Sequence, residues 1–163
     1  MQTLVSLGNC TRLAIMLSLV DLIIGNIAVS KGFDTAADSV NKCNEWFLHK
    51  TIEADDLYEY LENLDETGVL SFAALERDTM RRNIWMCIGN ALVYTIWMAY
   101  NYEGREYLPE TIESVDDDTI NQFAECFSQV YPNGDLLIQK LTRQFSSYSD
   151  TSISLSEVKA LAC

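Results

Sequence analysis

Apolar residues recur at intervals of three and four along most of this 163-residue chain. That spacing places them on one face of an α-helix, whereas the strict alternation typical of a half-buried strand is nearly absent. We therefore expect an all-α fold, a bundle of about six helices. The pattern predicts helices over residues 11–30, 35–50, 51–66, 71–102, 119–130 and 136–145.

The longest periodic stretch, residues 71–102, is expected to form the central, aromatic-rich helix of the bundle. One ridge at four-residue spacing carries Ile84, Ile88, Leu92, Ile96 and Tyr100, and the adjacent ridge carries Trp85, Gly89, Val93 and Trp97. Apolar residues on two ridges indicate a helix that packs on more than one side. A break in this helix is expected just before Arg81.

Residues 13–29 are apolar enough to resemble a signal peptide or a membrane span. However, Arg12 is the only basic residue before them, and Asp21 and Asn26 interrupt the apolar run. A secretory signal carries a positively charged leader, and an aspartate in a bilayer is costly. We therefore predict a buried core helix here and no membrane partner.

The chain length fits one helical domain spanning residues 1–163. Residues 146–163 are rich in serine and threonine. This composition predicts a loosely packed tail that ends in a short helix near residues 157–161.

Charge distinguishes this chain more than its size does. It has 24 acidic and 11 basic residues, which gives a formal net charge of −13. A surface this negative repels nucleic acids and anionic lipids and attracts basic partners. We therefore expect no nucleic-acid partner, although acidity that merely promotes solubility is an alternative interpretation.

Most of the acidic residues fall in two windows, residues 53–66 and 103–118, and tyrosines accompany both. On a helix through the first window, four acids would lie within about 60° of one another, opposite Leu57, Leu61 and Leu64. Such like charges repel, and no lysine relieves them. We interpret the windows as docking surfaces for a basic partner. The candidate contact residues are Asp55, Glu59, Glu62 and Glu66, followed by Tyr58, Asp116, Asp117 and Asp118.

Catalytic and metal-binding patterns are scarce in the sequence. His49 is the only histidine, there is no CxxC or HxxxH spacing, and residues 116–118 lack the alternating ligands and glycine of a calcium loop. Five widely spaced cysteines favour a reducing, cytoplasmic compartment. We predict no enzymatic activity, no cofactor and no metal.

Several segments resemble immunity proteins of bacterial polymorphic toxin systems, and in particular the small all-helical family catalogued as the sixth. The resemblance spans roughly residues 44–121. It rests on ADDLYEYL at 54–61, DETG at 65–68, ALVYTIWMAY at 91–100, LPE at 108–110 and VDDDTI at 115–120.

This resemblance implies a cytoplasmic antidote that binds and blocks a cognate toxin with a basic surface. Toxins of such systems are often nucleases, whose clefts are basic, so the acidic windows fit that role. The alternative is an acidic helical regulatory adaptor, or a nucleic-acid mimic, that binds another basic protein. A third hypothesis is a small helical enzyme that uses His49 with a carboxylate.

Overall fold

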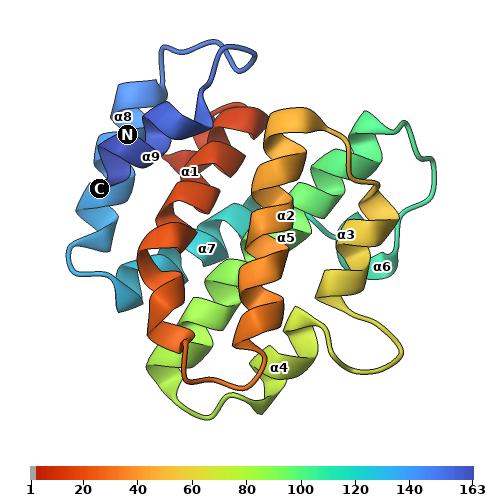
Figure 1. The fold of residues 1–163 in the computed structure, drawn as a ribbon. Coiled ribbons are helices and arrows are strands. Elements are labelled where there is room, and N and C mark those ends of the chain that lie inside the picture. The colour runs from red at the N-terminus through yellow and green to blue at the C-terminus, as the bar shows by residue number, and fades with distance from the viewer. Residues whose placement is uncertain (1–2) are drawn as a thin grey trace.

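The computed structural model describes residues 3–163, and every regular element in that range is helical (Figure 1). The prediction of an all-α fold is confirmed. The expected number of helices was too low, because short helices lie between the long ones. The elements are the 3-10 helices η1 (Leu4–Ser6) and η2 (Ile24–Ile27), and the α-helices α1 (Asn9–Ile23), α2 (Phe33–His49), α3 (Ala54–Leu61), α4 (Val69–Leu75), α5 (Thr79–Tyr102), α6 (Glu110–Glu113), α7 (Asp117–Val130), α8 (Gly134–Phe145) and α9 (Leu155–Ala162).

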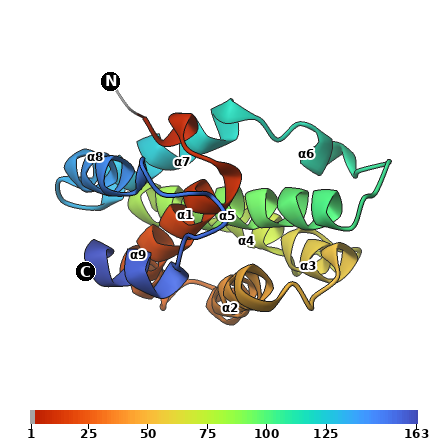
Figure 2. The ribbon, with the colours of Figure 1, turned by 90° about the horizontal axis from the view of Figure 1, so that it is seen from above.

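The helices form layers around α1 and α5, which pack against each other. Helix α7, together with η1 and α6, covers one side of this pair, and α2 and α9 cover the other (Figure 2). Helix α8 packs against both α7 and α9 at one edge, and α3 packs against α5 at the opposite end. Surfaces on α7 and on α2 therefore face away from each other.

Helix α1 is buried on nearly all sides. Every side chain from Leu13 to Val20 is at most 2% exposed, because α2, α5, α7 and α9 all pack against this helix. The helical stretch Asn9–Ile27 would be long and apolar enough to cross a membrane, but 61% of its most apolar window is buried within the protein. The structure thus places this stretch in the protein's own core, as predicted.

The predicted break before Arg81 is present, between α4 and α5. Asp78 caps the N-terminus of α5, because its carboxylate accepts a hydrogen bond from the backbone N–H of Arg81 at 2.9 Å. This bond satisfies one of the free N–H groups at the helix start. Helix α5 then contacts α1, α2, α3, α4, α6 and α7.

The prediction of a loosely packed tail is wrong. Leu155, Val158 and Ala162 of α9 are buried against the rest of the protein. Before α9, the Asp150 carboxylate accepts hydrogen bonds from the backbone N–H groups of Cys10 and Thr11, at 3.1 and 2.9 Å. The tail therefore supplies the cap that the N-terminus of α1 lacks locally, which no local sequence pattern could show.

Candidate partner-binding surface

The first acidic window does not form the predicted four-acid helix face. Helix α3 ends at Leu61, and Glu62 is already extended (φ −151°, ψ 143°). The cause is Asn63, whose side-chain oxygen accepts hydrogen bonds from the backbone N–H groups of Asp65 and Thr67 at 3.0 and 3.2 Å. Such side-chain turns compete with continuation of a helix.

Residues beyond the end of α3 consequently lie away from their predicted positions. Glu66 sits in a turn with a positive φ of 56°. Leu64, expected in the core, is fully exposed. Only Asp55 and Glu59 of the four predicted acids lie on the helix.

Two of these acids are bonded within the protein. The Asp55 carboxylate accepts hydrogen bonds from the Tyr100 hydroxyl at 2.6 Å and from Arg105 at 2.7 Å. These bonds hold the pKa of Asp55 below its ordinary value, and the bond from Tyr100 contributes most. The Glu62 carboxylate accepts from the hydroxyls of Tyr58 and Thr111.

Tyr58, a predicted contact residue, is half-buried. The pKa of this tyrosine is raised to about 12, mainly by burial and next by its hydrogen bond to Glu62. Among residues 3–163, no hydrogen bond or ion pair engages the carboxylates of Glu59 and Glu66. Of the four acids predicted to share one helix face, these two have carboxylates without a partner in that range.

The second window supplies the start of α7, where three consecutive aspartates have three different surroundings. The Asp116 carboxylate caps the helix by accepting from the backbone N–H of Asp118 at 2.9 Å. Asp117 forms an ion pair with Arg12 at 3.3 Å, although its side chain is 67% exposed. The Asp118 carboxylate is exposed and has no partner within the described part of the chain. Negative charge also complements the N-terminal end of the helix dipole.

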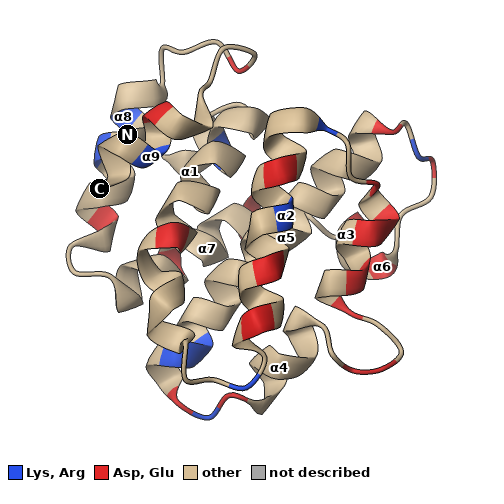
Figure 3. Ribbon diagram, in the orientation of Figure 1, with Lys and Arg blue, Asp and Glu red and all other residues tan. Residues whose placement is uncertain are grey.

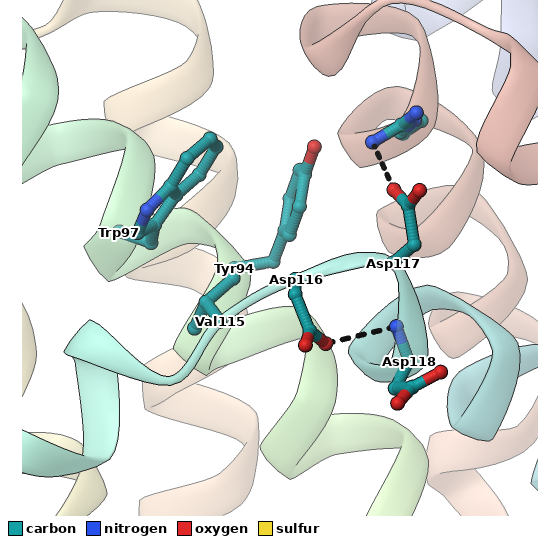
Figure 4. A pocket seen from close by; sticks show the side chains of 7 residues that line it. Tyr94, Trp97, Val115, Asp116, Asp117 and Asp118 are labelled. Carbon is teal, nitrogen blue, oxygen red and sulfur yellow. Dashed lines mark hydrogen bonds and ion pairs between the residues drawn. The ribbon is translucent and has the colours of Figure 1, made fainter.

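Beside these aspartates lies a hollow of about 490 Å³, which we call the acid–aromatic hollow (Figure 4). Tyr94 and Trp97 project into it from α5, with ring centroids 5.4 Å apart. The hollow is lined by Arg12, Tyr94, Trp97, Val115, Asp116, Asp117 and Asp118.

Two lining groups of this hollow are held firmly. The Arg12 side chain is only 15% exposed and also donates to the backbone carbonyl of Val5. The Tyr94 hydroxyl donates to the side-chain oxygen of Asn9 at 3.0 Å, and burial raises the pKa of this tyrosine. The walls are therefore preorganised, whereas the Asp118 carboxylate remains exposed.

Sequence reasoning missed Arg12, Tyr94 and Trp97 as members of a candidate site. Trp97 was assigned to a core ridge, and in the structure it is only half-buried. Nothing local in the sequence links Arg12 to Asp117. The one available signal was that Arg12 is the only basic residue before the apolar segment.

The two acidic windows meet where α3 lies beside residues 103–111, but Glu59 and Asp118 lie in different layers. Glu59 lies on the side of α2, where it lines a small hollow with Thr35 of that helix. The hydroxyl of neighbouring Tyr60 donates to Asp38 of α2 at 2.9 Å. Asp118 begins α7, in the opposite layer (Figure 2). Figure 3 likewise shows acidic residues spread along α2, α3 and the segment that leads to α6.

The chemistry of the acid–aromatic hollow favours a cation. An ammonium or guanidinium group is attracted both to a carboxylate and to the face of a tryptophan ring. Within residues 3–163, no three His, Cys, Asp or Glu side chains come together as they would around a metal ion. His49, the residue of the enzyme hypothesis, is exposed at the end of α2.

Comparison with known protein families identifies the chain. The family model described as Immunity protein Imm6 matches residues 11–130, well over half of the sequence. The chain belongs to the Imm6 immunity protein family. No curated protein and no solved structure matches it.

Imm6 membership confirms the resemblance found in the sequence and extends it in both directions. The matched region now includes α1 from Thr11 onward and the whole of α7. Membership implies an immunity protein that acts against a toxin. Every residue that lines the acid–aromatic hollow lies within the Imm6 match.

Proposed function

We propose that this Imm6 protein neutralises a cognate toxin domain in the cytoplasm by stoichiometric binding, without catalysing a reaction. The toxin presents a basic surface, as a nuclease domain does, and the complex blocks that surface. The observation that carries the proposal is the acid–aromatic hollow, which three consecutive aspartates line together with Tyr94 and Trp97.

Net charge supports this kind of partner. A protein with a net charge of −13 attracts a basic partner over long range and speeds its association. Long-range attraction alone does not select one toxin. Selection requires local contacts that a wrong partner cannot make.

The acid–aromatic hollow supplies such a contact. In our proposal, a lysine or arginine of the toxin enters the hollow, stacks on Trp97 and pairs with Asp118. Asp117 adds negative charge on the rim, while Asp116 and Arg12 hold the start of α7 in place. Because the walls are already bonded within the protein, binding orders few side chains and loses little entropy.

Glu59 and Glu66 form a second, smaller group of available acids. They belong to the side of α3 and α2, so one rigid partner in the hollow would not contact them. We assign them to long-range attraction rather than to the interface. Asp55, Glu62 and Tyr58, which bond within the protein, are assigned to stability.

The test is co-expression of charge-reversal variants with the toxin domain encoded by the neighbouring gene. We expect Asp118→Lys to weaken binding by at least about 2 kcal/mol, or roughly 30-fold, and to lose protection of the cell. Asp118→Asn, which removes the charge with little change in shape, should show a smaller loss in the same direction. Circular dichroism should show that both variants keep the wild-type helix content.

The matched control is Asp65→Lys, because it changes the net charge equally at an exposed loop position. It should retain nearly full protection. If Asp65→Lys and Asp118→Lys lose equal affinity, only overall charge matters and the hollow is not the interface. If Glu59→Lys abolishes protection while Asp118→Lys does not, the toxin docks on the α2 and α3 side.

A further inference from the structure

A second hollow opens between η1, α7 and α8, and we call it the apolar socket. Its volume is about 280 Å³. Leu4 and Ile138 are buried within its lining, and Ala124 and Ser128 of α7 form another part of the wall. Pockets for small molecules usually hold about 300–1,000 Å³, so this socket lies at their lower limit and matches a large side chain.

The lining of the socket includes a buried side chain whose hydroxyl has no partner among residues 3–163. Thr142 of α8 is 1% exposed, and its hydroxyl makes no hydrogen bond to any residue that the structure describes. A threonine in a helix commonly donates to a carbonyl one turn earlier, and Thr142 does not. Leaving such a group unpaired is unfavourable, so a bound atom that pairs with it gains affinity.

The rim of the apolar socket is acidic. Glu125 of α7 and Asp135 of α8 line it, both exposed and without a side-chain partner in the described chain. An incoming apolar group flanked by a basic residue would therefore be favoured over one flanked by an acid.

The outer face of α7 joins the socket to the acid–aromatic hollow. A third hollow, of about 530 Å³, shares Asp118 with the acid–aromatic hollow and shares Asn121 and Glu125 with the socket. These residues recur at three- and four-residue spacing, so they lie on one helix face. From Asp118 to Ser128 the helix rises about 15 Å.

We infer that the apolar socket receives an aromatic side chain of the toxin, one that carries a hydrogen-bonding group, as tyrosine and tryptophan do. The polar atom of this side chain pairs with the Thr142 hydroxyl, and its ring packs against Leu4 and Ile138. This inference rests on the proposed function, and it places a basic residue of the toxin about 15 Å away, in the acid–aromatic hollow. Interface anchors of this kind are enriched in tyrosine, tryptophan and arginine.

The experiment fills the socket with a substituted side chain and measures the affinity of each variant for the toxin domain encoded by the neighbouring gene. Ser128→Trp places an indole in the socket from its wall, and Ser147→Trp makes the same change at an exposed position outside it. We expect Ser128→Trp to bind at least about tenfold more weakly and Ser147→Trp to stay within about twofold of wild type. Thr142→Val, which keeps the side-chain shape, should bind about fivefold more weakly without losing thermal stability.

A second measurement separates failure of the socket from failure of the proposed function. Nuclear magnetic resonance with N-acetyltyrosinamide as the probe should show saturable shifts at Ala124 and Thr142 of the wild type. Ser128→Trp should abolish these shifts, and N-acetylphenylalaninamide should bind more weakly.

Each outcome decides the inference. If the wild type binds the toxin and Ser128→Trp binds equally well, the socket is not part of the interface and the inference is overturned. If the wild type does not bind that toxin, the proposed function fails. The titration with N-acetyltyrosinamide then decides by itself whether the socket binds an aromatic side chain. Saturable shifts confined to the socket then support a binding site for an aromatic side chain, and absent or scattered shifts overturn it.

Discussion

Asp55 provides the clearest test of whether the α3 acids serve stability or docking. The sequence pattern made this residue a first-choice contact for a partner. In the structure its carboxylate accepts from the Tyr100 hydroxyl and from Arg105. The perturbation is Asp55→Ala, which removes the acceptor from both groups.

The expected cost follows from the burial of the two donors. Tyr100 is 2% exposed, and a buried hydroxyl left without an acceptor costs about 1–3 kcal/mol. The Asp55 side chain is 60% exposed, so water can partly replace it, and we take the lower half of that range. The pair with Arg105 is exposed and screened by solvent, so it adds little. We expect a total near 2 kcal/mol, or a melting temperature lower by about 4–8 °C.

The assay is thermal and urea unfolding of Asp55→Ala, Tyr100→Phe and the double variant. Because the two residues share one hydrogen bond, the double variant should lose less stability than the sum of the single variants. Binding of the toxin by folded Asp55→Ala should be nearly unchanged. Wild-type stability together with lost protection would refute our reasoning and restore Asp55 as a contact residue.

Lowering the pH should remove the stabilisation that the Asp55 carboxylate contributes. The pKa of Asp55 is lower in the folded protein than in the unfolded chain, so the folded state favours the ionised form. The stabilisation is present above the ordinary carboxyl pKa, about 3.9, and is lost as the pH falls through the lower, folded-state value. The stability difference between wild type and Asp55→Asn should therefore shrink below about pH 4, and a difference that grows on acidification would contradict the assignment.

Two further predictions concern the backbone. Asp150→Ala removes the acceptor for the backbone and hydroxyl of Thr11 at the start of α1, so urea unfolding should show a loss of about 2 kcal/mol, and an unchanged midpoint would contradict the cap. Gly32→Ala brings a Cβ within 2.2 Å of the Phe72 ring at a φ of +90°, whereas Gly104→Ala, at a φ of +70°, meets nothing within 4 Å. Gly104→Ala should cost about 1–2 kcal/mol for its backbone, and Gly32→Ala should cost about 1–3 kcal/mol more in thermal unfolding. Equal losses would show that Phe72 moves aside.

The sequence predicted those parts of the fold that depend on neighbours along the chain. Helix formation and its interruption are local, so apolar spacing located α1, α2, α5 and α7, and the break between α4 and α5 was found close to Asp78. The end of α3 is also local, yet it was missed, because the turn made by the Asn63 side chain overrode a helical pattern of charges. The family resemblance likewise came from contiguous segments and is confirmed.

What each acidic side chain does was decided only by the tertiary structure. Asp55 meets Tyr100 and Arg105, Asp117 meets Arg12, and Asp150 meets the start of α1, all across separations of at least 45 residues. No periodicity encodes such pairs, because they arise when helices distant in sequence pack together. Charge counts alone therefore could not tell an acid bonded inside the protein from Asp118, whose carboxylate has no partner among residues 3–163. The sequence determined that this chain is helical, acidic and an immunity protein, and packing determined which carboxylates are bonded within the protein.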